Sequence, residues 1–249
     1  MTDPIKRDLP RLSPQNGVGN GPSSVALAPS RPSRPSRTVP IYSLGEELVH
    51  SISHGIGALL SIAALVLLII RAVSNAPEGR LAGCVVGFTL FGSSLIILYL
   101  MSTLYHSMLP RRARYVFKIL DHSAIYILIA GTYSAFCLSV LPTASCWTLF
   151  GIIWGLAILG VTLDSVFGCR LVWVSFPLYL IMGWLALAVV RSLLAILPSI
   201  SITFLLLGGI SYTLGCAFFA LKRKWMHGVW HLFVLAGSVL HFFAVYFAI

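Results

Sequence analysis

Seven long apolar segments constrain this chain more than any other feature of its sequence. They lie at about residues 48–70, 81–108, 116–139, 145–163, 171–190, 199–221 and 226–248. Each is close to the length of about 20 residues that a helix needs to cross a bilayer. Charged residues make up only 10% of the chain, against about 25% in typical soluble domains. The sequence therefore predicts an all-α integral membrane protein, a bundle of seven transmembrane helices.

Lys and Arg residues are distributed unevenly among the segments that join these helices. The N-terminal tail and the second, fourth and sixth loops hold 14 of the 17, and the other three are Arg71, Arg80 and Arg191. Because basic loops stay in the cytoplasm, we expect the N-terminus inside and the C-terminus outside the cell (inner) membrane. The net charge of +10 follows from this topology. Since the basic residues are dispersed over loop ends, we expect no nucleic-acid partner.

The chain divides into a polar tail and one membrane domain. Residues 1–40 contain eight of the 13 prolines and the low-complexity run S-R-P-S-R-P-S-R. This composition predicts a disordered, basic, Pro/Ser-rich cytoplasmic tail. Residues 41–249 then form the seven-transmembrane domain, and its short loops leave no room for a separate soluble domain.

Titratable residues gather at the predicted inner ends of three helices. His106 lies near the end of the second span, and Asp121 lies near the start of the third. His227 and His231 begin the seventh span and are one turn apart on one helix face. At 1.5 Å of rise per residue, all four lie within roughly 10 Å of the cytoplasmic boundary. Because ionisable side chains are costly in a bilayer, they are functional candidates.

This combination predicts a metal centre. Three imidazoles are a ligand set of catalytic zinc sites, which keep a fourth position open to water. We expect one Zn²⁺ per chain on His106, His227 and His231, although imidazole also suits Fe²⁺, Ni²⁺ or Co²⁺. Asp121 would orient the water and accept its proton. Ser102, one turn before His106, either donates a hydrogen bond to an oxyanion or simply packs. Such a site favours hydrolysis of an amide or ester.

The start of the first span is also polar. Ser43 and Glu46 match a capping box, which gives Glu46 a sufficient structural role. Glu47, His50 and His54 share one helix face, either as a hydrogen-bonded helix entry at the interface or as a functional surface.

Two other histidines are expected to be structural. His122 is rotated about 100° round the helix from Asp121 and should face elsewhere. His241 lies roughly 15 Å deeper than His231, too far for a shared ion, and should be buried and hydrogen-bonded within the bundle.

Taken together, these motifs resemble the hemolysin III family, the bacterial branch of the progestin and adipoQ receptor superfamily. They are E-x-x-H-x-x-x-H-G in the first span, S-x-x-x-H in the second, Asp in the third and H-x-x-x-H in the seventh. The resemblance covers residues 42–249. It implies a seven-helix protein with an inward N-terminus and a zinc ion near the inner leaflet. The family's ligands map onto His106, His227 and His231, and its water-orienting carboxylate maps onto Asp121.

Ser102, Glu47 and His54 also match the family pattern, whereas His50 stands where the receptors commonly carry Asn. Eukaryotic relatives resemble ceramidases, so the resemblance implies a zinc-dependent hydrolase of lipid amides or esters, with membrane lipid as substrate. One alternative is a non-enzymatic receptor or regulator of membrane homeostasis with structural zinc. Another is a pore-forming, hemolysin-like channel, which the concentration of polar residues at one end weakens. Whether the protein is an enzyme, its substrate and its oligomeric state are left open by the sequence.

Overall fold

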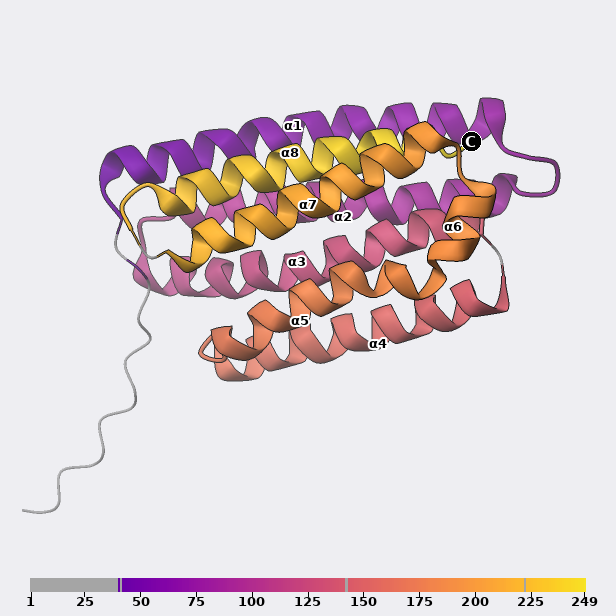
Figure 1. Cartoon of the computed structure of the whole chain (residues 1–249). Helices are drawn as coiled ribbons and strands as arrows, with labels where there is room; N and C mark the ends of the chain where they lie inside the picture. Colours follow the sequence, from indigo (N-terminus) through magenta and orange to yellow (C-terminus); the bar gives the residue numbers. More distant parts are fainter. Residues whose placement is uncertain (1–39, 41, 142, 222) are drawn as a thin grey trace, which may run out of the picture. The chain divides into compact units, whose positions relative to one another are not determined.

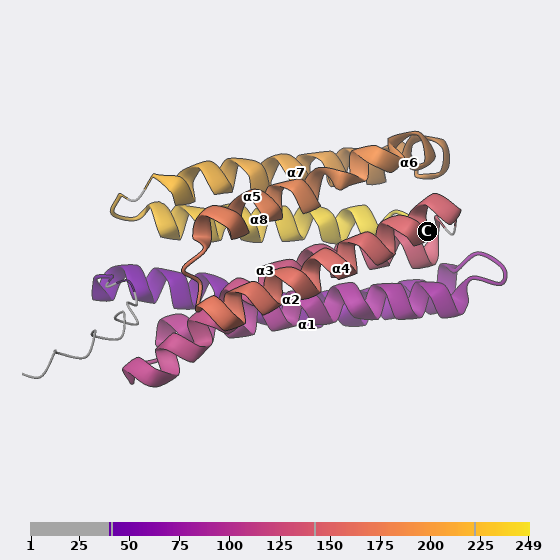
Figure 2. The same cartoon turned by 90° about the horizontal axis from the view of Figure 1, so that it is seen from below.

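A computed structural model describes residues 40, 42–141, 143–221 and 223–249, so nearly all of the predicted tail lies outside the described residues. The described part is helical and contains no strand. Its elements are α1 (Leu44–Asn75), α2 (Leu81–Ser107), α3 (Arg111–Ser139), α4 (Ala144–Phe167), α5 (Val172–Trp184), the 3₁₀ helix η1 (Leu185–Val189), α6 (Val190–Ile196), α7 (Ser199–Ala220) and α8 (Met226–Tyr246). Figures 1 and 2 show these helices as a bundle.

In the described part of the chain, seven helical segments are long and apolar enough to cross a membrane. Six of these segments are single helices. The remaining one, the fifth in chain order (Val172–Ile196), combines α5, η1 and α6. The predicted fold class is therefore confirmed. The orientation of the termini stays a prediction.

Consecutive helices pack side by side, and α8 returns to lie against α1 (Figure 1). Glycines permit the closest approaches. A Cβ added at Gly57 in α1 would lie 2.6 Å from the ring of Tyr99 in α2. One added at Gly208 in α7 would lie 2.4 Å from the ring of His241 in α8. Small residues at such positions let membrane helices pack tightly without a hydrophobic driving force.

The predicted capping box begins α1. The Ser43 hydroxyl accepts a hydrogen bond from the Glu46 amide at 3.4 Å, and the Glu46 carboxylate accepts one from the Ser43 amide at 3.0 Å. The other Glu46 oxygen accepts the amide of Trp225 at 2.9 Å. Near the opposite end, Arg71 donates to the carbonyl of Tyr246 at 3.3 Å. Thus α1 is joined to the α8 segment at both ends.

The fifth span differs from the single helix expected at residues 171–190. It continues through Pro177, changes to the 3₁₀ helix η1 and ends as α6. The hydroxyl of Tyr133 in α3 donates to the carbonyls of Met182 (2.7 Å) and Gly183 (3.2 Å). Because these carbonyls have a partner from another helix, the backbone can leave the α-helical pattern there.

Candidate metal centre

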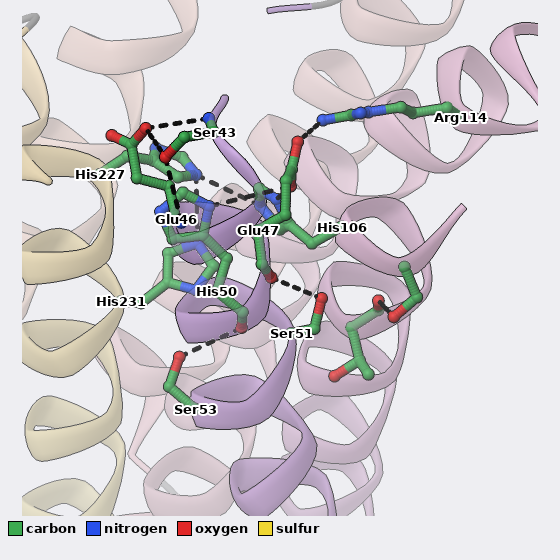
Figure 3. A network of polar contacts seen from close by, with 12 residues as sticks. Ser43, Glu46, Glu47, His50, Ser51, Ser53, His106, Arg114, His227 and His231 are labelled. Carbon is green, nitrogen blue, oxygen red and sulfur yellow. Dashed lines mark hydrogen bonds and ion pairs between the residues drawn. The ribbon is translucent and has the colours of Figure 1, made fainter. Parts of the chain in front are cut away.

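His106, His227 and His231 lie together at the end of the bundle where α2 ends and α8 begins (Figure 3). Nε2 of His227 is 3.3 Å from Nε2 of His106 and 3.1 Å from Nε2 of His231. His106 and His231 are buried, and His227 is half-buried. The fold thus brings together histidines from two helices that are distant in the sequence.

These distances suit a shared cation better than hydrogen bonds between the rings. An imidazole nitrogen carries either one proton or one lone pair in the ring plane, so Nε2 of His227 can satisfy only one of its two contacts. Two nitrogens bound at about 2.0–2.1 Å to a tetrahedral ion lie about 3.3 Å apart. The distances from His227 to His106 and from His227 to His231 are therefore compatible with donors that share an ion.

His50 belongs to the same cluster. Donor atoms of His50, His106 and His227 all lie within 4.8 Å of one another. The side chain of His50 is fully buried, and neither ring nitrogen has a hydrogen-bond partner among the described residues. His54 is buried next to it and stacks on His231, with ring centroids 3.7 Å apart. The polar face of the first span is thus directed at the histidines of α8.

A carboxylate fixes the orientation of His106. Oε2 of Glu47 is 2.7 Å from Nδ1 of His106, whose Nε2 faces His227. Arg114, in the first turn of α3, donates to the other carboxylate oxygen of Glu47 (Figure 3). A carboxylate partner sets the tautomer and ring orientation of a metal-binding imidazole. Sequence reasoning did not identify Arg114, because nothing in local spacing pairs it with Glu47.

Tyr42 covers the cluster from the segment that precedes α1. Its ring stacks on His227 with centroids 5.1 Å apart, and it lies edge-on to His50 at 5.0 Å. Burial raises the pKa of Tyr42 to about 12, so the phenol is neutral at physiological pH. Sequence reasoning missed this residue too, whose only signal is an aromatic side chain directly before the capping box.

Asp121 and Ser102 line a small cavity together with His227 and His231. The cavity has a volume of about 40 Å³, which is enough for water. Ser102 is buried, and its hydroxyl has no hydrogen-bond partner among the described residues. The predicted carboxylate and hydroxyl therefore lie beside the imidazoles, around a space that water can enter.

His122 does not face away from this cavity as expected but lines it, like Asp121. Two adjacent residues about 100° apart on a helix can both border a cavity that lies between their directions. Donor atoms of His122, Asp164 and Cys169 lie within 4.8 Å of one another. Asp164 is already engaged by neutral groups, since it accepts hydrogen bonds from the hydroxyls of Ser175 (2.9 Å) and Tyr179 (3.4 Å), so this second group is less suited to an ion.

A larger apolar cavity of about 330 Å³ adjoins the small one. The residues that line both are Leu98, Ile125, Tyr179, Trp230 and Val234. Its other walls include Leu187 in η1 and Leu206 in α7, which are 58% and 51% exposed on the outer surface of the bundle. Exposed apolar residues therefore form part of the cavity wall. His241 also lines it, with Nε2 3.2 Å from the carbonyl of Leu205, which confirms its expected hydrogen bond.

Comparison with known proteins gives a consistent result. Residues 42–242 match a family described as haemolysin-III related. Hemolysin-3 of Bacillus cereus is 46% identical over 203 residues, which cover 81% of this chain and 91% of that protein. The hemolysin-3 homolog of Bacillus subtilis (strain 168) is 43% identical over 208 residues, which cover 83% and 96%. No solved structure gives a significant match.

Proposed function

The chain belongs to the haemolysin-III-related family of multi-pass membrane proteins, and from this premise we propose that it is a metal-dependent, ceramidase-like hydrolase of lipid amides or esters. One observation carries the proposal: a small cavity whose lining includes Asp121, Ser102 and imidazoles adjoins a large apolar cavity whose walls include exposed residues. Polar groups suited to acyl transfer thus lie at the end of a space suited to a hydrocarbon chain.

His106, His227 and His231 would hold a Zn²⁺ ion, with Glu47 behind His106. The converging nitrogens and the unpartnered buried ring atoms of this cluster fit such an ion. A zinc ion bound there supplies Lewis-acid polarisation of a carbonyl and lowers the pKa of water. The fit rests on the donor set, since imidazole is a common zinc ligand.

The remaining polar residues would move the protons. Asp121 accepts a proton from the attacking water and passes it to the leaving nitrogen or oxygen. Ser102 donates a hydrogen bond to the acyl oxygen as negative charge develops on it. The water oxygen bonds to the acyl carbon, the C–N or C–O bond breaks, and a fatty acid and an amine or alcohol leave.

The large cavity would hold the acyl chain. Its volume of about 330 Å³ falls in the range of about 300–1,000 Å³ found for small-molecule sites, and most of its lining is apolar. The exposed walls at Leu187 and Leu206 allow a membrane lipid to enter sideways. The same apolar lining does not favour the pore alternative, because an ion pathway needs polar groups along its length.

A non-enzymatic regulator with a structural metal ion is the second candidate. The observation that favours it is the fourth buried imidazole, His50, beside the three expected ligands. Structural zinc sites are commonly closed by four protein ligands, whereas catalytic sites keep one position open.

Lipid turnover tests the first candidate. Metal-loaded protein in liposomes would receive N-acylsphingosine with a labelled acyl chain, and released fatty acid would be measured by mass spectrometry. We expect release by the wild type, its loss with a chelator, and little release by Asp121→Ala even when that variant is loaded with metal. If metal-loaded wild type releases no more fatty acid than Asp121→Ala from amide and ester lipids alike, the hydrolase proposal is refuted.

A further inference from the structure

We propose that His50 is a fourth ligand of the metal centre, so that the bound ion is surrounded by four imidazoles. This inference rests on the metal site of the proposed function but not on lipid hydrolysis. If four imidazoles occupy the four positions of a tetrahedral ion, none is left for water. Water or substrate must then bind as a fifth ligand. His50 would thereby regulate access to the ion.

Burial is the first argument for this role. The side chain of His50 is fully enclosed, and both ring nitrogens are without a hydrogen-bond partner among the described residues. A buried polar group without a partner is costly in an apolar bundle. A cation within the cluster would give one of the two nitrogens its missing partner.

Ring geometry is the second argument. The centroid of the His50 ring lies 4.6 Å from that of His106, 4.7 Å from that of His227 and 4.9 Å from that of His231. The first two rings are edge-on to His50, at interplanar angles of 63° and 80°. A Cβ added at Gly228 would lie 3.5 Å from Nε2 of His50, so this nitrogen faces the first turn of α8, which carries His227. The four rings therefore surround one small volume.

Glu47 leaves His50 free to bind the ion. Its Oε2 lies 4.0 Å from Nδ1 of His50, which is beyond hydrogen-bond distance, but 2.7 Å from Nδ1 of His106. A small approach would let the same carboxylate support both rings through Nδ1, with both Nε2 atoms directed at the ion.

His54 does not share this role, although its ring nitrogens also have no partner among the described residues. Its ring stacks on His231 with centroids 3.7 Å apart and planes at 18°. In such a stack the lone pairs of the two rings run side by side rather than converge. The stack instead holds His231 in place.

The test is the coordination of the ion in full-length protein purified in detergent. X-ray absorption of the Zn²⁺-loaded wild type should give four imidazoles, a result that needs no variant. After exchange with Co²⁺, the wild type should show the strong visible absorption of a four-coordinate ion. In His50→Asn, solvent completes the coordination shell, so X-ray absorption should show three imidazoles. The affinity for Zn²⁺ should fall by at least about 10-fold, because even the loss of a residue that only hydrogen-bonds to a metal ligand typically costs about 10–100-fold.

His241→Asn is the matched control, because it makes the same change at a buried histidine deeper in α8. It should keep the wild-type affinity and cobalt spectrum. Three imidazoles in the wild type, or unchanged affinity in His50→Asn, would overturn the role of His50 while leaving the proposed function intact. A wild-type protein that binds neither Zn²⁺ nor Co²⁺ would overturn the metal site itself.

Discussion

Replacing Glu47 by Gln should weaken metal binding by about 10-fold, and replacing it by Ala by up to about 100-fold. The magnitude follows from one contact, the 2.7 Å approach of Oε2 of Glu47 to Nδ1 of His106. The two side chains are 13% and 0% exposed, so solvent screens the contact little. Hydrogen bonds to charged groups contribute about 1.5–3 kcal/mol, and about 1.4 kcal/mol corresponds to a tenfold change in affinity. Because Gln retains an acceptor oxygen, we expect its loss of metal affinity at the lower end of this range.

Competition with a coloured chelator would measure the Kd of Zn²⁺ in detergent. Arg114→Gln is the control, because Arg114 donates to the other oxygen of Glu47, the one that does not approach His106. Both Glu47→Gln and Arg114→Gln break the same ion pair, and thermal unfolding of the metal-free proteins would report that common loss. Only the Glu47 variants should show a large change in Kd.

An equal loss of affinity in Glu47→Gln and Arg114→Gln would refute this reasoning. It would mean that the ion pair acts through the position of α3 rather than through the orientation of His106. Unchanged affinity in Glu47→Ala would likewise show that the carboxylate does not support the ligand.

Three further predictions concern the same centre and the topology. Elemental analysis should show that Asp121→Ala loses much less metal than His227→Ala, because Asp121 orients the water and does not bind the ion. Equal losses would make Asp121 a ligand. Metal content should be full near pH 7.5 and fall toward about pH 5, because protons compete for the imidazoles. Tyr42 contributes nothing to this change, since its pKa is about 12, and content independent of pH would contradict a histidine site. A reporter fused after Ile249 should be active outside the cell, and an inward C-terminus would mean that one predicted span does not cross.

Hydropathy was sufficient to predict the helices, because a bilayer span must satisfy its own backbone hydrogen bonds and so leaves few alternatives. The break in the fifth span could not be predicted in the same way. It depends on the hydroxyl of Tyr133, a residue of α3, which reaches the carbonyls of Met182 and Gly183. Contacts of this kind arise from helix packing and leave no local signal.

In the candidate site, too, some features could be predicted from the sequence and others could not. Spacing within one helix predicted that His227 and His231 share a face, and depth in the membrane grouped them with His106. The partner of His50 was undetermined, because helical periodicity does not say which helix packs against α1. For His122 the angular argument was wrong, because two adjacent side chains about 100° apart can both border a cavity that lies between them.

The packing of α8 against α1 explains why the cluster can form. Glu46 binds the amide of Trp225 at one end, and Arg71 binds the carbonyl of Tyr246 and lies over its ring at the other. With both ends joined, α1 cannot slide along α8, and His50 is kept opposite His227. An ion held between these helices would connect residues from the two ends of the domain. Because it would bind the folded bundle and not the unfolded chain, it would stabilise the fold, and this stabilisation would increase with the logarithm of the free metal concentration once that concentration exceeds the Kd.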